Sequence, residues 1–132
     1  MYDVIIVKYF NNVYYSMETL IEVNKKEEKW IIIFQFAGEL DETNADKTFK
    51  QIYDDIGDFK GKKIVFNMKW LKYLNSKSIG YIADVFSNIE DNNGKMYICE
   101  CTDGVKDILE LVGITTIIPT VDSEKEALKE LD

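Results

Sequence analysis

The sequence predicts an α/β fold in which helices pack on a mixed, mostly parallel sheet. Short apolar runs typical of buried strands alternate with stretches in which apolar side chains recur every three or four positions, the spacing of one helix face. The length of 132 residues suits one core and is short for two domains of ordinary size. With 46% hydrophobic and 30% charged residues, the composition is that of a folded globular protein. We therefore predict a single α/β domain.

The first sixteen residues are expected to be an extension, with residues 17–132 forming the domain itself. Val4 to Val7 is a short apolar run, and Asn11-Asn12 predicts a turn before a second run at 13–15. We expect the extension to add a strand or a hairpin to one edge of the sheet. Such a strand either protects the edge or pairs with another molecule, so a homodimer through the extension is one possible outcome. The run is too short for a signal peptide or a membrane span.

The remaining elements follow from the same two periodicities. Strands are expected at 19–23, 30–36, 63–67, 96–101 and 116–118. Helices are expected at about 43–56, 76–89, 103–112 and 123–131, with Gly57 and Gly113 as stops. Segment 24–29 predicts a hairpin, and segment 69–73 is expected to be a loop. The core is expected to contain Ile33, Phe34, Val65, Phe66, Ile82, Phe86, Ile98 and Leu109.

The helix expected to begin near Ser76 carries the residues most relevant to function. Its apolar positions 79, 82, 83, 86 and 89 share one stripe. Ser76 stands at its start, where a serine usually caps the helix by accepting a backbone N–H bond. The same position would tolerate a phosphate, because unpaired N–H groups and the positive end of the helix dipole form an anion site. Both uses of Ser76 are open on this evidence.

The composition excludes several classes of function. A net charge of −8 and the absence of arginine argue against binding to nucleic acid. The absence of histidine removes the usual general base and a common metal ligand, so we predict no catalytic residues, no metal and no cofactor. Cys99 and Cys101 stand two apart on an expected strand and are predicted to point the same way from one face, as reduced, packed thiols.

Four short segments together carry a resemblance to a known family. Gly38-Glu39-Leu40-Asp41, Tyr73–Gly80, Leu109–Gly113 and Asp122–Leu128 stand in the order and spacing of the motifs G-E-L-D, F-L-D-S-S-G-L-G, L-E-L-T-G and D-S-E-E-E-A-L. These are motifs of the STAS domain family, in particular of the bacterial anti-sigma factor antagonists, which the chain resembles from about residue 17 to residue 131. The resemblance implies a mixed sheet of four or five strands covered by helices, with a regulatory serine at the start of the second helix.

The resemblance also implies a regulatory cycle in the cytoplasm. The unphosphorylated protein binds an anti-sigma factor that is also a serine kinase, which frees the sigma factor, and phosphorylation by that kinase ends the binding. Carried over by position, the phosphoacceptor is Ser76. The residues expected to contact the partner are Asp41, Asn44, Asn75, Ser76, Lys77 and Ser78.

The chain departs from the family pattern at the site itself. Asn75 replaces an aspartate, Lys77 replaces a small hydroxyl residue and Ser78 replaces a glycine. Together with Lys69 and Lys72 in the expected loop, these changes predict a more positive surface around Ser76.

Two other classes of function stay open. The first is a STAS scaffold or a subunit of a signalling or membrane-transport complex, in which Ser76 is not phosphorylated. The second is an enzyme, for which Asp41, Glu39 and the Lys77 amine are the candidate groups. We disfavour the enzyme because no pair of base and orienting group is visible in the sequence.

Overall fold

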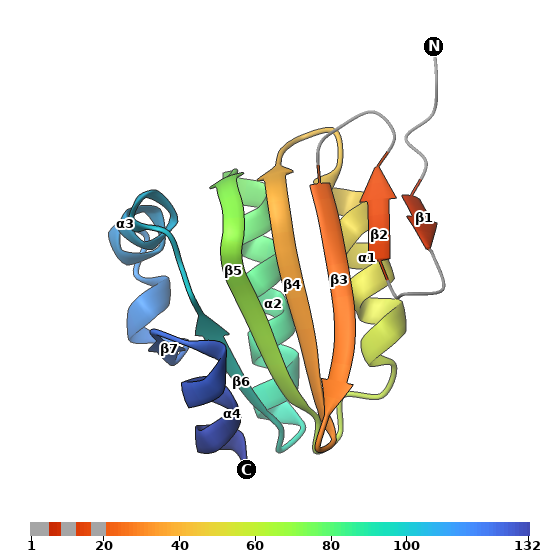
Figure 1. Cartoon of the computed structure of the whole chain (residues 1–132), viewed down its shortest axis with the longest axis vertical. Coiled ribbons are helices and arrows are strands. Elements are labelled where there is room, and N and C mark those ends of the chain that lie inside the picture. The colour runs from red at the N-terminus through yellow and green to blue at the C-terminus, as the bar shows by residue number, and fades with distance from the viewer. Residues whose placement is uncertain (1–5, 9–12, 17–20) are drawn as a thin grey trace.

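A computed structural model describes residues 6–8, 13–16 and 21–132 (Figure 1). Its strands are β1 Ile6–Lys8, β2 Val13–Ser16, β3 Ile21–Glu28, β4 Ile31–Leu40, β5 Lys63–Leu74, β6 Lys95–Cys99 and β7 Thr120–Val121. Its helices are α1 Ala45–Ile56, α2 Ser76–Asp91, α3 Asp103–Leu111, the short 3-10 helix η1 Ile114–Thr116, and α4 Glu124–Leu131.

The strands form one mixed sheet in the order β1-β2-β3-β4-β5-β6-β7. The pairings from β1 to β4 are antiparallel, and those from β4 to β7 are parallel. The predicted α/β fold is confirmed. Within the described residues, the N-terminal extension adds a hairpin, β1 and β2, to the edge of β3, as expected. Val4, Ile5, the turn at Asn11-Asn12 and position 19 lie outside the described residues.

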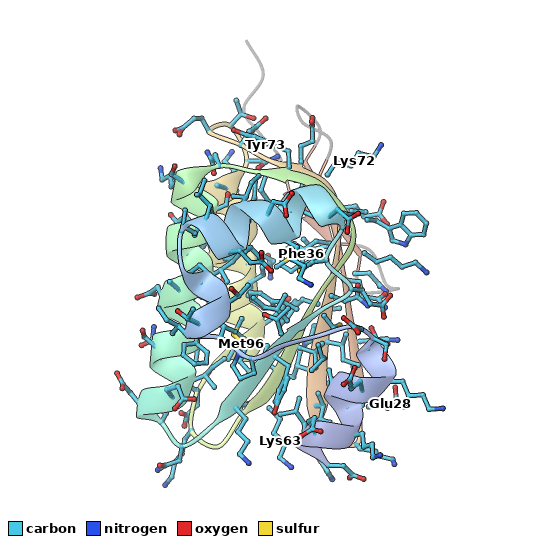
Figure 2. The ribbon with its side chains drawn as sticks, turned by 90° about the vertical axis from the view of Figure 1, so that its left-hand side faces the viewer. Glu28, Phe36, Lys63, Lys72, Tyr73 and Met96 are labelled. Carbon is cyan, nitrogen blue, oxygen red and sulfur yellow. The ribbon has the colours of Figure 1, made fainter. Side chains whose placement is uncertain are left out.

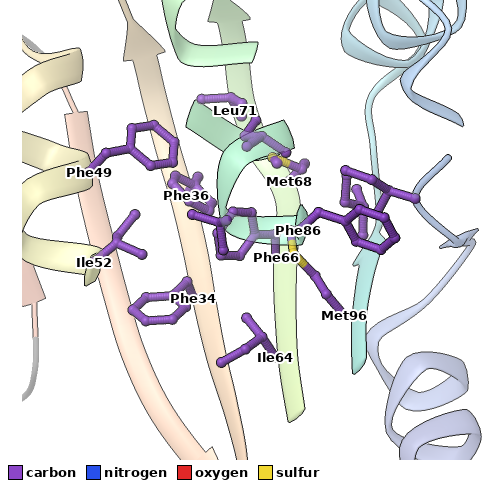
Figure 3. Close-up of a cluster of buried hydrophobic side chains, with 14 of the residues drawn as sticks. Phe34, Phe36, Phe49, Ile52, Ile64, Phe66, Met68, Leu71, Phe86 and Met96 are labelled. Carbon is purple, nitrogen blue, oxygen red and sulfur yellow. The ribbon is translucent and has the colours of Figure 1, made fainter. Parts of the chain in front are cut away.

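The main core lies between the sheet and helices α1, α2 and α3 (Figures 1 and 3). Parallel strands that are covered on both faces need apolar residues at nearly every position, which explains the continuous run at 31–34. Phe66 packs edge-to-face against Phe34 and Phe36, with ring centroids 5.7 and 5.2 Å away. All eight predicted core residues are buried, including Phe86 at 9% exposure.

A smaller cluster lies under α4 on the other face of the sheet. Ile31, Ile33, Val65 and Cys99 pack there against Ala127 and Leu131. Beside this cluster, one carboxylate collects three hydrogen bonds: Oε1 of Glu124 accepts from Gln35 and Asn67, both at 3.0 Å, and Oε2 accepts from Lys26 at 2.8 Å. Burial raises the pKa of Glu124, but these hydrogen bonds outweigh it, and the net pKa lies below the ordinary value.

The expected loop at 69–73 is instead part of strand β5, which runs to Leu74. It pairs with β4 along the full length of both strands, from Ile31 opposite Lys63 to Leu40 opposite Leu74, with two register shifts on the way. Trp70, Leu71 and Tyr73 therefore have partners in β4, and this pairing between distant residues could not be seen in the local sequence. Lys69 and Lys72 are exposed on β5 and do not form a loop with Lys77 (Figure 2 labels Lys72).

The expected strand at 116–118 is wrong. Gly113 has φ +81°, which lets the chain turn directly after α3 into the 3-10 helix η1. The strand comes two residues later as β7, after Pro119 accepts a hydrogen bond from the Ile98 N–H at 2.9 Å.

The two cysteines lie on different faces of the sheet, which corrects the prediction that both point the same way. Cys99 ends β6 and belongs to the cluster under α4, whereas Cys101 packs against the main core. Glu100 between them has φ +56°, so the chain leaves the strand before alternation would return Cys101 to the first face. Burial raises the pKa of Cys99, and it raises the pKa of Cys101 to about 11, so both thiols are protonated at neutral pH.

Candidate functional site

The ends of strands β4 and β5 bring the two predicted segments together. The Asn75 N–H donates to the Leu40 carbonyl at 3.0 Å, so the loop that follows β4 lies beside the start of α2 (Figure 1). A side-chain contact joins them as well, because Nδ2 of Asn75 donates to Oε1 of Glu42 at 3.2 Å. The grouping of 41–44 with 75–78 that the family resemblance implied is therefore present in space.

Asn75 is the N-cap of α2, which corrects the expectation that Ser76 caps this helix. Its Oδ1 accepts from the Ser78 N–H at 2.9 Å and from the Ser78 hydroxyl at 2.7 Å. Asparagine caps a helix as well as serine does, and the cap stands one residue before the helix, so Ser76 becomes the first helical residue. The Ser76 side chain is exposed there.

Two of the six predicted contact residues are buried and cannot meet a partner directly in this fold. The hydroxyl of Ser78 is engaged with Asn75, and its side chain has no exposed area. Asn44 is also fully buried, where Oδ1 accepts from the Asp41 N–H at 3.0 Å and Nδ2 donates to the Glu39 carbonyl at 2.8 Å. The hydrogen bonds of Ser78 and Asn44 instead hold the two segments that carry the exposed predicted contact residues.

Asp41 is half-buried and folds the loop after β4. Its Oδ1 accepts from the Thr43 N–H at 2.9 Å and from the Thr43 hydroxyl at 2.6 Å, the geometry of a local turn. Its carbonyl accepts the Ala45 N–H at 3.0 Å, which starts α1. The loop is thus held from within, and Glu42 is left exposed beside Asn75.

Lys77 is not free to make the site positive. Its Nζ lies 2.9 Å from the carboxylate of Asp46 on α1, and the Tyr81 hydroxyl donates to the same carboxylate. The hydrogen bonds from Tyr81 and Lys77 lower the pKa of Asp46, while the bond to Asp46 raises the pKa of both Lys77 and Tyr81. Exposed Glu42 and paired Lys77 make this surface less positive than the sequence alone suggested.

The surface along α2 beyond Ser76 is shallow. Tyr81 stacks on Phe49 of α1 with ring centroids 4.9 Å apart, and the Tyr53 hydroxyl donates to Asp84. Lys77, Gly80, Tyr81 and Asp84 line an open depression of about 390 Å³. An open, shallow surface suits a protein partner better than an enclosed small molecule.

Sequence reasoning missed Glu42, Asp46 and Tyr81. Glu42 directly follows the Gly38–Asp41 motif, so its position was a usable signal. Asp46 and Tyr81 are 35 residues apart on two helices, and only the packing of α1 against α2 joins them.

The described residues offer little for other chemistry. Among them, no group of three or more His, Cys, Asp or Glu side chains is arranged to hold a metal ion. In the same part of the chain, none of the helices is long and apolar enough to cross a membrane.

Comparison with known proteins shows the family and the fold of this chain. A model of the STAS domain family matches residues 22–127. An anti-sigma F factor antagonist of Paenibacillus polymyxa is 27% identical over 112 residues, which cover 85% of this chain and 96% of that protein. An anti-sigma factor antagonist from Mycobacterium paratuberculosis superposes with a TM-score of 0.74 at 15% identity, over 84% of this chain and 93% of that one. The phosphorylated form of the Bacillus cell fate determinant SpoIIAA superposes with a TM-score of 0.65 at 15% identity, over 83% and 99% of the two chains.

Proposed function

The chain belongs to the STAS domain family, and we propose from this premise that it is an anti-sigma factor antagonist. In the proposed cycle it binds an anti-sigma factor that is also a serine kinase, thereby releases a sigma factor for transcription, and is switched off by phosphorylation of Ser76. The role is regulatory binding in the cytoplasm and not catalysis, with residues 17–132 as the binding domain and residues 1–16 as an extension.

One observation carries the proposal. Ser76 is an exposed hydroxyl at the first residue of α2, beside the loop of Asp41 and Glu42, whereas Ser78 two positions later is fully buried. A kinase can therefore reach Ser76 without unfolding the helix. The structural neighbour SpoIIAA exists in a phosphorylated form, which supports phosphorylation of a protein with this fold.

A phosphate on Ser76 would act through charge while the fold is kept. It would add roughly −1.5 to −2 charges at a helix N-terminus, where the dipole and free N–H groups favour an anion. Lys77 is held by Asp46, and Glu42 stands beside Asn75, so side chains here offer the phosphate little compensation. A partner surface fitted to a neutral serine would have to bury the dianion, which is costly without a counter-charge.

The test is incubation with the candidate anti-sigma kinase and ATP, followed by mass mapping. We expect a single phosphate on Ser76 and none on Ser78. Ser76→Ala should bind the partner constitutively, and Ser76→Asp should bind at least about tenfold more weakly, a change of about 1.4 kcal/mol. Ser87→Asp is the matched control, because Ser87 is exposed at the far end of the same helix.

A scaffold function is the second candidate, and a specific observation favours it. Lys77 and Ser78 replace the small residues that follow the serine in the family motif, and Lys77 is tied to Asp46. A kinase that reads the motif would meet this changed surface. Binding of the partner without phosphorylation under any condition, and with equal affinity for Ser76→Asp, would favour the scaffold.

A further inference from the structure

The turn between β3 and β4 contains a tryptophan with an unusual backbone conformation. Glu28 pairs with Ile31, so the turn consists of Lys29 and Trp30 alone, with φ +52° and +69°. Two-residue hairpin turns of this kind require positive φ, and glycine or asparagine normally supplies it. A bulky side chain there is a genuine outlier. Trp30 is also 92% exposed, which removes any packing benefit within the chain.

A groove lies directly beside this turn. It separates the hairpin from one side of α4 and has a volume of about 340 Å³, enough room for one large aromatic side chain. The residues on α4 recur with helical spacing and so form one stripe. The groove is lined by Glu28, Lys29, Lys125, Leu128, Lys129 and Asp132. The exposure of Trp30 means that it does not fill the groove of its own chain.

We propose that the β3–β4 turn and this groove form a self-association surface, in which Trp30 of one copy packs into the groove of a second copy. A tryptophan anchor and a groove next to each other on one face are self-complementary under a two-fold axis, because each copy then offers both halves. The side chain of Leu128 in one copy then packs against the indole ring of Trp30 from the other copy. Tryptophan is one of the three residue types enriched among the dominant anchors of protein interfaces.

The charges around the groove fit the same occupant. The lining carries three lysines and two carboxylates, Glu28 and Asp132, so it offers both signs of charge for pairing with the opposite signs on a second copy. A strongly anionic occupant such as a lipid surface would meet those two carboxylates as well. The mixed signs therefore favour a second copy of this chain.

The surface is independent of the Ser76 site. Strand β4 begins beside Trp30 and ends at Leu40 beside Asn75, so its ten residues separate the two by roughly 30 Å. It is also separate from the β1 edge, where the N-terminal extension was predicted to pair. Association through Trp30 would leave the Ser76 surface of each copy open.

Sedimentation equilibrium over a range up to about 1 mM measures the association, and fluorescence reports on Trp30. The chain has two tryptophans, so Trp70→Phe leaves Trp30 as the sole indole emitter. We expect the average mass to rise towards the dimer and the Trp30 emission to move to shorter wavelength over the same concentrations. A monomer throughout this range, or unchanged emission as the mass rises, would overturn the proposal.

Trp30→Gly separates an interface role from a structural one. Glycine suits φ +69°, so the melting temperature should stay equal or rise, while association weakens at least tenfold. Trp70→Ala is the matched control, since Trp70 is 62% exposed on β5 and should leave association unchanged. If Trp30→Gly associates as strongly as the wild type, the interface lies elsewhere. An emission shift with anionic vesicles at constant monomer mass would assign the turn to a membrane, and either result overturns the proposal.

Discussion

The two faces of the sheet are stabilised in different ways. The face under α1, α2 and α3 is a continuous apolar core in which phenylalanine rings interlock (Figure 3). The face under α4 has a small apolar cluster and, beside it, the network in which Glu124 joins three other side chains. The first depends on area removed from water. The second depends on complete pairing of polar groups, which costs most when one partner is lost.

This difference has a consequence for regulation. The Ser76 site and the helix that carries it are built on the apolar face, where packing of buried apolar side chains supplies most of the stability. In the proposed cycle, a change of charge at Ser76 would therefore alter the surface offered to the partner without disturbing the core beneath α2. The α4 face, in contrast, contains a partly buried carboxylate, Glu124, whose shifted pKa should make stability respond to pH.

The largest expected effect is on the apolar face. Phe66→Ala removes a fully buried ring between Phe34 and Phe36, and it should lower the free energy of unfolding by about 3–5 kcal/mol. Urea unfolding followed by circular dichroism measures this. Tyr73→Ala, at a ring that is 44% exposed on the same strand, is the control and should cost much less. Equal losses would mean that Phe66 is not close-packed.

The next effect tests the polar face. Glu124→Ala leaves Gln35, Asn67 and Lys26 without their shared acceptor, and it should cost about 1–3 kcal/mol in the same unfolding experiment. Glu130→Ala, on an exposed position of the same helix, is the matched control and should be close to neutral. If the two variants unfold alike, the network contributes nothing to stability.

Glu124 should also make stability depend on pH. Its pKa in the folded protein lies below the ordinary value of 4.5, so the carboxylate contributes stability that is fully present above that value. This contribution is lost as the pH falls through the folded pKa, because the unfolded chain takes up the proton first. As the pH falls below about 5, Glu124→Gln should therefore lose stability less steeply than the wild type. Parallel curves from urea unfolding at each pH would contradict this.

The same contrast explains what the sequence could predict. Periodicity found the helices and all eight predicted core residues, because burial on the apolar face repeats with the period of each element. It could not find the Glu124 network or the Asp46–Tyr81 contact, whose members are far apart in the chain and carry no local pattern.

The family motif located the site residues but predicted their roles only in part. The motif located the loop of Asp41 and the start of α2, yet it did not distinguish exposed Ser76 from buried Ser78 and Asn44. That distinction depends on the hydrogen bonds that hold Ser78 against Asn75 and Asn44 against the loop after β4, and no local pattern shows these bonds. The extension of β5 to Leu74 escaped for a related reason, since pairing with β4 and not local propensity keeps it in the sheet.

The smallest expected effect tests the helix start itself. Asn75→Ala removes the cap that accepts from the Ser78 N–H and hydroxyl, and it should cost about 1 kcal/mol in urea unfolding. Ser76→Ala should cost only a few tenths of that, because alanine is a good residue at the first helical position. Asn75→Asp restores the acceptor, but it places a carboxylate next to Glu42, to which the Asn75 amide donates at 3.2 Å in the wild type. It should therefore recover only part of the stability lost in Asn75→Ala. Combination with Glu42→Gln should recover more of it, because the repulsion between the two carboxylates is then removed. A larger loss for Ser76→Ala than for Asn75→Ala would return the cap to Ser76, and it would then be necessary to explain how a capping hydroxyl could also accept a phosphate without loosening α2.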